Sequence, residues 1–345
     1  ISEIRWMPLL RKGLLMKEKA KKTLSFLLRF GLSAGLLFYL FQKNDITKTI
    51  EIAKSADIFY LFIALVCIFA IYGLLLIRWR IVIKMLDVNI SMKNMTRWFF
   101  IGAFFNFVLP TSSGGDVVKA IGLCKGTKER TKVVASVVLD RIFGFIAITI
   151  VALVSYFVAR KIAHDQFLLN GIIVLFVVSW GGLLFLLNER LYSFACNIFN
   201  RFAIVKEKLL KLHQAFALIK GKFRAMFFLI AISSLGQLIL GFVYFFTAKG
   251  FHQEVDLIYC IAFAPLICIA SSLPSIGGLG FRENATVLLF MKIGLTKPAA
   301  VSISLLYLLY IVIVGLVGAI VYVCSVSSRR VQCDQPDSAS GTKDH

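Results

Sequence analysis

Long apolar runs recur along almost the whole sequence, and they restrict the fold more than any other feature. Six of them cover residues 24–41, 58–77, 133–158, 167–187, 226–247 and 299–324. A helix of about 20 apolar residues crosses the hydrocarbon core of a bilayer. With 59% hydrophobic residues, the chain leaves no part large and polar enough for a separate soluble catalytic domain. The sequence therefore predicts an all-α polytopic membrane protein.

Two further apolar stretches, residues 98–109 and 257–273, are interrupted by helix-breaking residues. The first runs into Leu-Pro-Thr-Ser-Ser-Gly-Gly at 109–115, and the second into Leu-Pro-Ser-Ile-Gly-Gly at 273–278. Proline and glycine are the two residues least compatible with a helix interior. We therefore expect each stretch to break and to continue as a second short segment.

The basic residues gather in alternate connecting segments. Seven Lys or Arg lie in residues 1–23, and eight lie in residues 188–225. Cytoplasmic loops carry such an excess, so the pattern predicts a cytoplasmic (inner) membrane protein with both termini in the cytoplasm. The net charge of +21 is then expected to face anionic lipid headgroups, with no nucleic acid as a partner. The predicted organisation is a basic N-terminus at 1–23, a membrane domain at 24–324 and a disordered cytoplasmic tail at 325–345.

The same charge pattern predicts how the interrupted stretches cross the membrane. Both flanks of the first one, residues 78–97 and 125–132, are basic and expected in the cytoplasm. About six spanning helices and two re-entrant hairpins entering from opposite faces satisfy this pattern, whereas eight spans would also leave both termini inside. Broken segments that enter from opposite faces are typical of inverted-repeat transporters, whose substrate binds near the membrane midplane.

The basic segment 188–225 contains a short amphipathic pattern. Leu209, Leu212, Phe216 and Ile219 recur at helical spacing between lysines in residues 206–222. Such a helix lies on the inner leaflet or packs against the protein. The segment is also a candidate docking site for a separate cytoplasmic enzyme.

Ionisable residues inside membrane segments are costly and are kept mainly when they are paired or functional. Asp116 and Lys119 follow the first glycine pair, where Asp116 is expected either to hold a headgroup or coupling cation or to cap the helix. Asp140 and Arg141 are neighbours in the third apolar run, so on a helix they point about 100° apart and each should reach a different partner.

Arg282 and Glu283 follow the second glycine pair. An arginine close to a broken helix offers two parallel hydrogen bonds to a phosphate group, such as that of a phospholipid. The structural alternative pairs Arg282 with Glu283 or with the region of Asp140 and Arg141. The full set of candidate substrate-binding residues is Asn106, Pro110, Gly114, Gly115, Asp116, Lys119, Asp140, Arg141, Pro274, Gly277, Gly278, Arg282 and Glu283.

The sequence predicts neither a catalytic centre nor a cofactor. The four histidines and seven cysteines are scattered, with none at metal-ligand spacing. The sequence also lacks the glycine-rich and nucleophile motifs that mark nucleotide-binding proteins and hydrolases. We therefore expect no metal and no cofactor.

Several short motifs, taken in order, resemble the transmembrane region of lysylphosphatidylglycerol synthases. They are Arg78-Trp79-Arg80, the run from Phe105-Asn106 to Gly115-Asp116, Asp140-Arg141, and the run from Leu273-Pro274 to Arg282-Glu283. The resemblance covers about residues 24–324. It implies the flippase-like membrane half of those proteins, and the soluble aminoacyl-transfer domain is expected to be absent from this chain.

Two functions follow as hypotheses. The first is translocation of a phospholipid, anionic or aminoacylated, or of a lipid-linked substrate. The second is a membrane subunit that acts with a separate catalytic protein in lysylphosphatidylglycerol synthesis or polyprenol-linked sugar metabolism. By itself the chain is not expected to be an enzyme, and the sequence predicts no oligomeric state.

Overall fold

The fold is a bundle of long helices, described from a computed structural model that covers residues 46–109, 114–158, 166–190, 213–273 and 278–333, with isolated positions 31, 35 and 38. In this part of the chain, five helices are long and apolar enough to cross a membrane. They are α3 (Ile58–Met85), α6 (Arg130–Val158), α7 (Gln166–Leu187), α10 (Phe223–Gly250) and α13 (Lys297–Cys333). Five of the six predicted spans are thereby confirmed as such helices. The remaining run, 24–41, and the N-terminus 1–23 lie outside the described residues except at those isolated positions.

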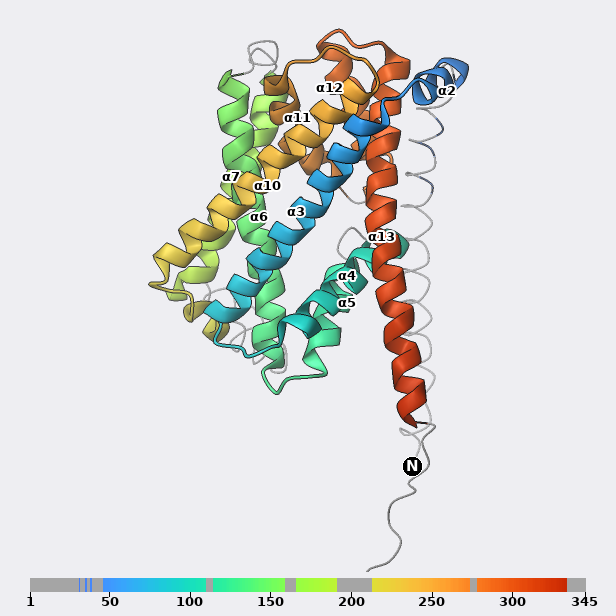
Figure 1. Ribbon diagram of the computed structural model, residues 1–345. Helices are drawn as coiled ribbons and strands as arrows, with labels where there is room; N and C mark the ends of the chain where they lie inside the picture. Colours follow the sequence, from blue (N-terminus) through green and yellow to red (C-terminus); the bar gives the residue numbers. More distant parts are fainter. Residues whose placement is uncertain are drawn as a thin grey trace, which may run out of the picture.

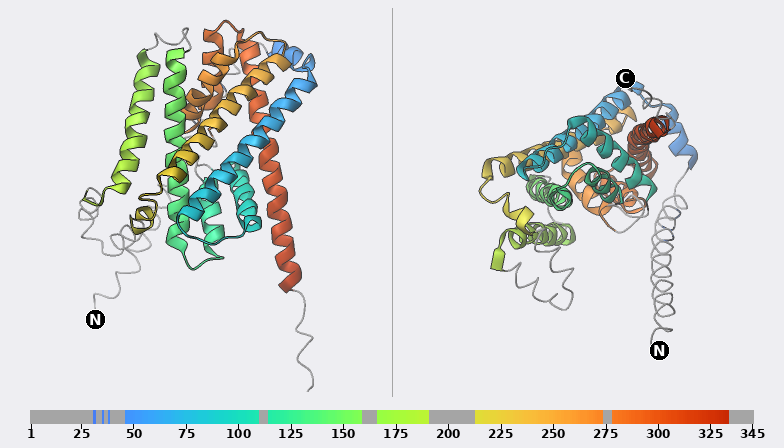
Figure 2. Two further views of the ribbon diagram at one scale, coloured as in Figure 1. Left: turned by 60° about the vertical axis from the view of Figure 1, so that its left-hand side comes forward. Right: turned by 90° about the horizontal axis from the view of Figure 1, so that it is seen from below.

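The two interrupted stretches form pairs of short helices. The first pair is α4 (Met92–Val108) and α5 (Gly114–Cys124), and the second is α11 (Leu257–Ser271) and α12 (Phe281–Lys292). Figures 1 and 2 show the pairs toward opposite ends of the bundle, with the second pair at the end that also holds the short helix α2 (Ile46–Lys54). Each pair therefore occupies one half of the bundle rather than its full length.

Two predicted boundaries were wrong, and both errors shortened a helix. Helix α3 continues through Arg78 to Met85, where a loop had been expected from residue 78. Helix α13 continues to Cys333, so residues 325–333 are helical rather than part of a disordered tail. Both extensions are free of proline and glycine, so nothing in them interrupts the helical hydrogen bonds. Residues 334–345 lie outside the described part of the chain.

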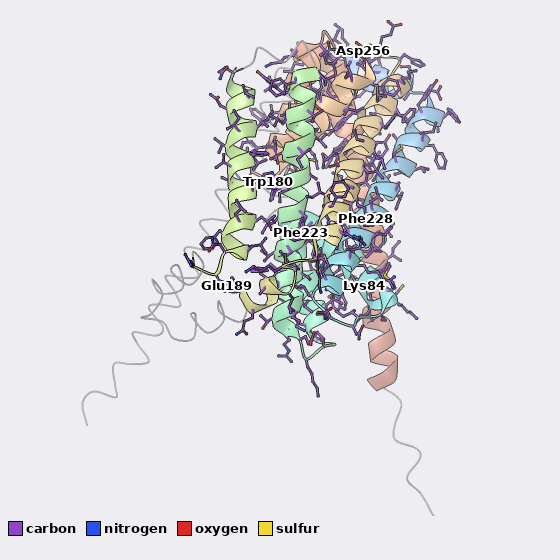
Figure 3. All side chains as sticks on the ribbon, turned by 90° about the vertical axis from the view of Figure 1, so that its left-hand side faces the viewer. Lys84, Trp180, Glu189, Phe223, Phe228 and Asp256 are labelled. Carbon is purple, nitrogen blue, oxygen red and sulfur yellow. The ribbon has the colours of Figure 1, made fainter. Side chains whose placement is uncertain are left out.

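The outer surface of the bundle is apolar. Large hydrophobic side chains project from it, and among those labelled in Figure 3, Phe223 is 74% exposed and Phe228 is 55% exposed. Exposed apolar surface on this scale is unfavourable in water and is the surface expected of helices that face lipid tails.

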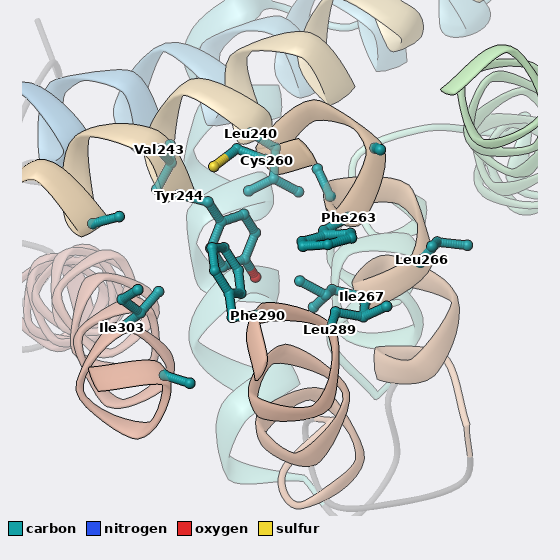
Figure 4. Close-up of a cluster of buried hydrophobic side chains, with 14 of the residues drawn as sticks. Leu240, Val243, Tyr244, Cys260, Phe263, Leu266, Ile267, Leu289, Phe290 and Ile303 are labelled. Atoms are coloured by element: carbon teal, nitrogen blue, oxygen red, sulfur yellow. The ribbon is translucent and has the colours of Figure 1, made fainter. Parts of the chain in front are cut away.

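The interior contains two apolar clusters. One includes residues of α10, α11, α12 and α13, and Figure 4 shows Tyr244, Phe263 and Phe290 within it. The ring centroid of Phe290 lies 5.8 Å from that of Tyr244 and 5.4 Å from that of Phe263. The other surrounds the fully buried Trp79 of α3. The two clusters hold the second helix pair and the far end of α3 in place.

Part of the basic segment belongs to this second cluster. Phe216 and Ile219 are fully buried with the side chains of α3, and Lys222 donates from Nζ to the carbonyl oxygen of Met85 at 2.6 Å. In the described residues 213–222, the apolar side chains therefore pack against the protein, which was the second of the two expectations. Leu209 and Leu212 lie outside the described residues.

Glycines permit close contacts around α4. A Cβ atom on Gly102 would lie 2.8 Å from the carbonyl oxygen of Gly115, and one on Gly318 of α13 would collide with the carbonyl oxygen of Phe100. Because a real Cβ does not fit at such distances, α5 and α13 approach the α4 backbone only where a side chain is absent.

We predict that Gly318→Ala destabilises the protein by about 1–3 kcal/mol, since the added methyl group must push α13 away from α4. Gly315 lies one turn away on the same helix, and a methyl group added there would have no other atom within 4 Å. Gly315→Ala should therefore leave stability unchanged or raise it by up to about 1 kcal/mol. Thermal unfolding in detergent, followed by tryptophan fluorescence, measures both. Equal melting temperatures for the two variants would contradict the packing argument.

Candidate functional site

A cavity of about 320 Å³ lies within the bundle, between the two helix pairs. Seven helices line it: α3, α4, α5, α6, α10, α11 and α13. The polar residues that line it are Tyr72, Arg78, Asn106, Asp116, Lys119, Asp140, Arg141, Ser233, Gln237, Ser271, Ser272 and Tyr307. Because the first pair contributes Asn106 and Asp116 while the second contributes Ser271 and Ser272, the cavity lies where the two broken elements approach each other.

Asp140 joins three helices through its carboxylate. The Arg78 guanidinium on α3 donates from Nε to Asp140 Oδ1 at 2.7 Å, and Lys119 Nζ on α5 lies 3.8 Å from Oδ2. Arg78 also donates from Nη1 to Ser233 Oγ on α10 at 3.1 Å. The side chains of Arg78, Lys119 and Asp140 are all less than 10% exposed. This buried contact therefore ties α3, α5 and α6 together, with α10 attached through Ser233.

Asp116 binds two cations. Lys119 Nζ lies 2.9 Å from Asp116 Oδ1, and Arg141 contacts Oδ2. The same lysine ammonium lies 4.7 Å from the centre of the Trp79 ring, a distance at which a cation is attracted to an aromatic face. The prediction that Asp140 and Arg141 reach different neighbours is confirmed, since one binds Arg78 and the other binds Asp116.

Asn106 connects the two helices of the first pair. Its side-chain Oδ1 accepts a hydrogen bond from the Gly115 N–H at 2.8 Å, so α4 satisfies one of the free backbone donors at the start of α5. The Asp116 carboxylate instead contacts Lys119 and Arg141. Asp116 is thus part of an ion cluster that consists of Arg78, Asp116, Lys119, Asp140 and Arg141.

Exposure differs strongly within the cluster. The Arg141 side chain is 42% exposed, whereas Asp116 is 9% exposed. Arg141 also lines the cavity. Of the three cations that line the cavity, Arg141 is therefore the one that a molecule in the cavity reaches most readily.

Arg282 and Glu283 form a separate buried pair behind the cavity. Arg282 donates from Nε to Glu283 Oε1 at 3.0 Å, and Glu283 Oε2 accepts from the Gly280 N–H at 2.6 Å. The Arg282 guanidinium lies 5.3 Å from the ring centre of Tyr307, which lines the cavity. In the described residues, the pairing of Arg282 with Glu283 is thus the expectation that the geometry supports.

The backbone before α12 explains this arrangement. Gly278 and Gly280 have φ angles of 81° and 91°, values that glycine adopts without strain. The chain can then turn sharply enough for Glu283, in the first turn of α12, to reach back to the Gly280 N–H. A carboxylate at that position also interacts favourably with the helix dipole.

The structure brings together only part of the predicted set. Five candidates line the cavity, namely Asn106, Asp116, Lys119, Asp140 and Arg141. Gly114 and Gly115 are buried at the start of α5, and Gly278, Arg282 and Glu283 are buried in the second pair. Pro110, Pro274 and Gly277 lie outside the described residues.

Several lining residues were missed. The polar ones are Tyr72, Arg78, Ser233, Gln237, Ser271, Ser272 and Tyr307. Arg78 was noted only as part of a motif and was assigned to a loop, because a basic residue at the end of an apolar run usually marks one. The sequence did contain a signal that Arg78 lies in a helix, because no proline or glycine follows it in residues 78–85. In the described part of the chain, no group of three or more His, Cys, Asp or Glu residues is arranged to hold a metal ion.

We predict that Asp140→Asn costs about 3–5 kcal/mol of stability, because Arg78 would then be a buried charge without a carboxylate partner, while Lys119 would keep only Asp116. Glu129→Gln provides a matched control, since Glu129 also pairs with a lysine, Lys132, at 3.0 Å but has a side chain 41% exposed. That variant should change stability by less than about 1 kcal/mol. Thermal unfolding in detergent compares the two, and equal losses would contradict a structural role for the buried contact.

Comparison with known proteins places this arrangement in a family. Residues 26–318 match the family model described as lysylphosphatidylglycerol synthase TM region. The chain is 25% identical over 298 residues to a UPF0104 membrane protein of Pyrococcus horikoshii, covering 79% of this chain and 88% of that protein. It is 22% identical over 315 residues to a UPF0104 membrane protein of Methanocaldococcus jannaschii, covering 85% of this chain and 91% of that protein. The protein is therefore a multi-pass membrane protein that belongs to the lysylphosphatidylglycerol synthase TM region family.

Proposed function

We propose that the protein translocates a phospholipid or lipid-linked substrate across the cytoplasmic membrane. The observation that carries this proposal is the cavity, which places five ionisable side chains between the two helix pairs of an otherwise apolar bundle. Bringing a polar headgroup into hydrocarbon costs several kcal/mol or more unless polar partners replace its water. The cavity supplies such partners, while the apolar outer surface leaves the acyl chains in the bilayer.

The two helix pairs enter the membrane as re-entrant hairpins in this proposal. The four short helices have 17, 11, 15 and 12 residues, and at 1.5 Å per residue they are about 16–26 Å long. A hydrocarbon core of about 30 Å exceeds each of them. Broken backbone at membrane depth is tolerated where it lines a polar cavity, and such elements from opposite faces form the substrate site of inverted-repeat transporters.

This topology predicts which loops share a side of the membrane. In a chain whose native cysteines are replaced by alanine, Ser91→Cys and Lys128→Cys flank the first pair, while Glu254→Cys and Thr296→Cys flank the second. All four positions are exposed. A membrane-impermeant maleimide should label the first two from the cytoplasmic face only and the second two from the opposite face only. Labelling of Ser91→Cys and Lys128→Cys from different faces would favour eight spans.

Translocation is tested with purified protein in vesicles containing acyl-labelled lipids, with a panel of phosphatidylglycerol, phosphatidylcholine and lysylphosphatidylglycerol. At least one lipid should change leaflet faster than in protein-free vesicles. Arg141→Gln should slow that transfer about tenfold, the effect of losing one charge-assisted hydrogen bond.

Lys132→Gln is the matched control, because Lys132 lies on the same helix and outside the cavity, paired with Glu129. It should transfer lipid at the rate of the unaltered protein. A folded, vesicle-inserted protein that moves none of the lipids would contradict the proposal and would favour the alternative of a membrane subunit that acts with a separate catalytic protein.

A further inference from the structure

The charges that line the cavity do not balance. Among the described residues, the charged lining groups are three cations, Arg78, Lys119 and Arg141, and two carboxylates, Asp116 and Asp140. The tip segments at residues 110–113 and 274–277 contain only Pro, Thr, Ser, Ile and Gly, so they add no charge. The described lining therefore has one surplus positive charge.

Neither carboxylate is available to a cation from a ligand. Asp140 already binds Arg78 at 2.7 Å and has Lys119 at 3.8 Å. Asp116 binds Lys119 at 2.9 Å and also contacts Arg141. An incoming ammonium group would thus meet carboxylates that each already bind two protein cations, and it would be repelled by the nearby positive groups.

The second buried pair does not change this balance. Arg282 and Glu283 neutralise each other, with exposures of 4% and 0% for their side chains. The Arg282 guanidinium lies over the ring of Tyr307, which lines the cavity, whereas Arg282 itself is not one of the lining residues. The charge that a ligand meets therefore comes from the Asp116, Lys119, Asp140, Arg141 and Arg78 cluster.

Arg141 is suited to binding the ligand's anionic group. Its side chain is 42% exposed, and its guanidinium contacts the Asp116 carboxylate. A guanidinium binds a phosphate group through two parallel hydrogen bonds. Because Lys119 also neutralises Asp116, a phosphate can take over the interaction with Arg141 without leaving Asp116 unpaired.

From this imbalance we infer that the cavity takes lipids whose headgroup is an anionic phosphodiester without an ammonium group, and discriminates against aminoacylated lipids. The inference rests on the proposed translocation. A lysine ester of phosphatidylglycerol keeps the phosphodiester but adds ammonium groups, so its headgroup is no longer anionic. The inferred preference for an anionic lipid therefore differs from a preference for lysylphosphatidylglycerol, which the family's name would suggest.

The direct test compares leaflet-transfer rates of three lipids with the same labelled acyl chain in vesicles containing the full chain. We expect phosphatidylglycerol to move at least about tenfold faster than lysylphosphatidylglycerol, the ratio that one charge-assisted hydrogen bond supplies. Phosphatidylcholine, which has a phosphodiester and a fixed positive charge, should also be slow. Transfer of the lysyl lipid at an equal or higher rate would overturn the charge inference and leave the proposed function intact. Absence of transfer for all three lipids would overturn both.

Variants separate the effect of charge from the effect of folding. Arg141→Gln removes the surplus charge and should reduce the rate ratio between the anionic and lysyl lipids to near one. Arg141→Lys keeps the charge and should retain a preference for the anionic lipid, even where the overall rate falls. Lys132→Gln, outside the cavity, should retain the full ratio. A ratio unchanged in Arg141→Gln would overturn the assignment of the selectivity to this cluster.

Soluble anions distinguish a lipid headgroup from free phosphate as the source of the negative charge. Inorganic phosphate and glycerophosphoglycerol are added at the same concentration as the labelled phosphatidylglycerol. Neither should slow lipid transfer, because neither has acyl chains that concentrate it in the bilayer. Equal competition by either compound would overturn the assignment of a lipid as the ligand.

Discussion

The buried contact between Arg78 and Asp140 is the interaction on which the arrangement of the bundle depends. It joins α3 to α6 across 62 residues of sequence, and through Lys119 and Ser233 it extends to α5 and α10. A single charge in an apolar bundle would be strongly unfavourable. Once Asp140 is placed, the positions of two cations follow, and the neighbouring Arg141 must turn toward Asp116. One helix thus orients the charged groups of the first helix pair.

The close backbone contacts make this arrangement possible. Lys119 and Asp116 lie one turn apart on α5, and this helix lies directly against α4, where Gly102 and Gly115 leave no side chain between the helices. The α4 backbone is supported on its other side by α13 at Gly318. Ion pairing and glycine packing are therefore not independent, since a Cβ on Gly102 would lie 3.2 Å from the Lys119 Cβ and a larger residue there would shift Lys119 relative to Asp140. Small residues take the role in this membrane bundle that apolar burial has in soluble proteins.

The sequence predicted the parts of this structure that depend on local pattern. Five spans and both interrupted stretches follow from apolar length and from Pro and Gly, which act within a few residues. The divergence of Asp140 and Arg141 followed from helix geometry. The role of Arg78 could not be predicted in this way. Counting charges assigns an arginine at the end of an apolar run to a loop, and its burial here depends on Asp140, a carboxylate far away in the sequence. The burial of Phe216 and Ile219 could not be predicted either. A helix on the membrane surface and a helix packed against α3 have the same amphipathic spacing of apolar residues.

Charge balance explains why the two halves of the bundle differ although both contain a glycine pair near ionisable residues. In the second half, Arg282 is followed at once by Glu283, and the pair closes on itself at exposures of 4% and 0%. In the first half, Asp116 and Lys119 pair across one helical turn but share their partners with Asp140 and Arg141, so the charges form a network open to the cavity. A closed pair contributes to the structure without interacting strongly with a ligand. An open network with a surplus cation would be stabilised by an anionic group, which is why we propose ligand binding in the first half of the bundle.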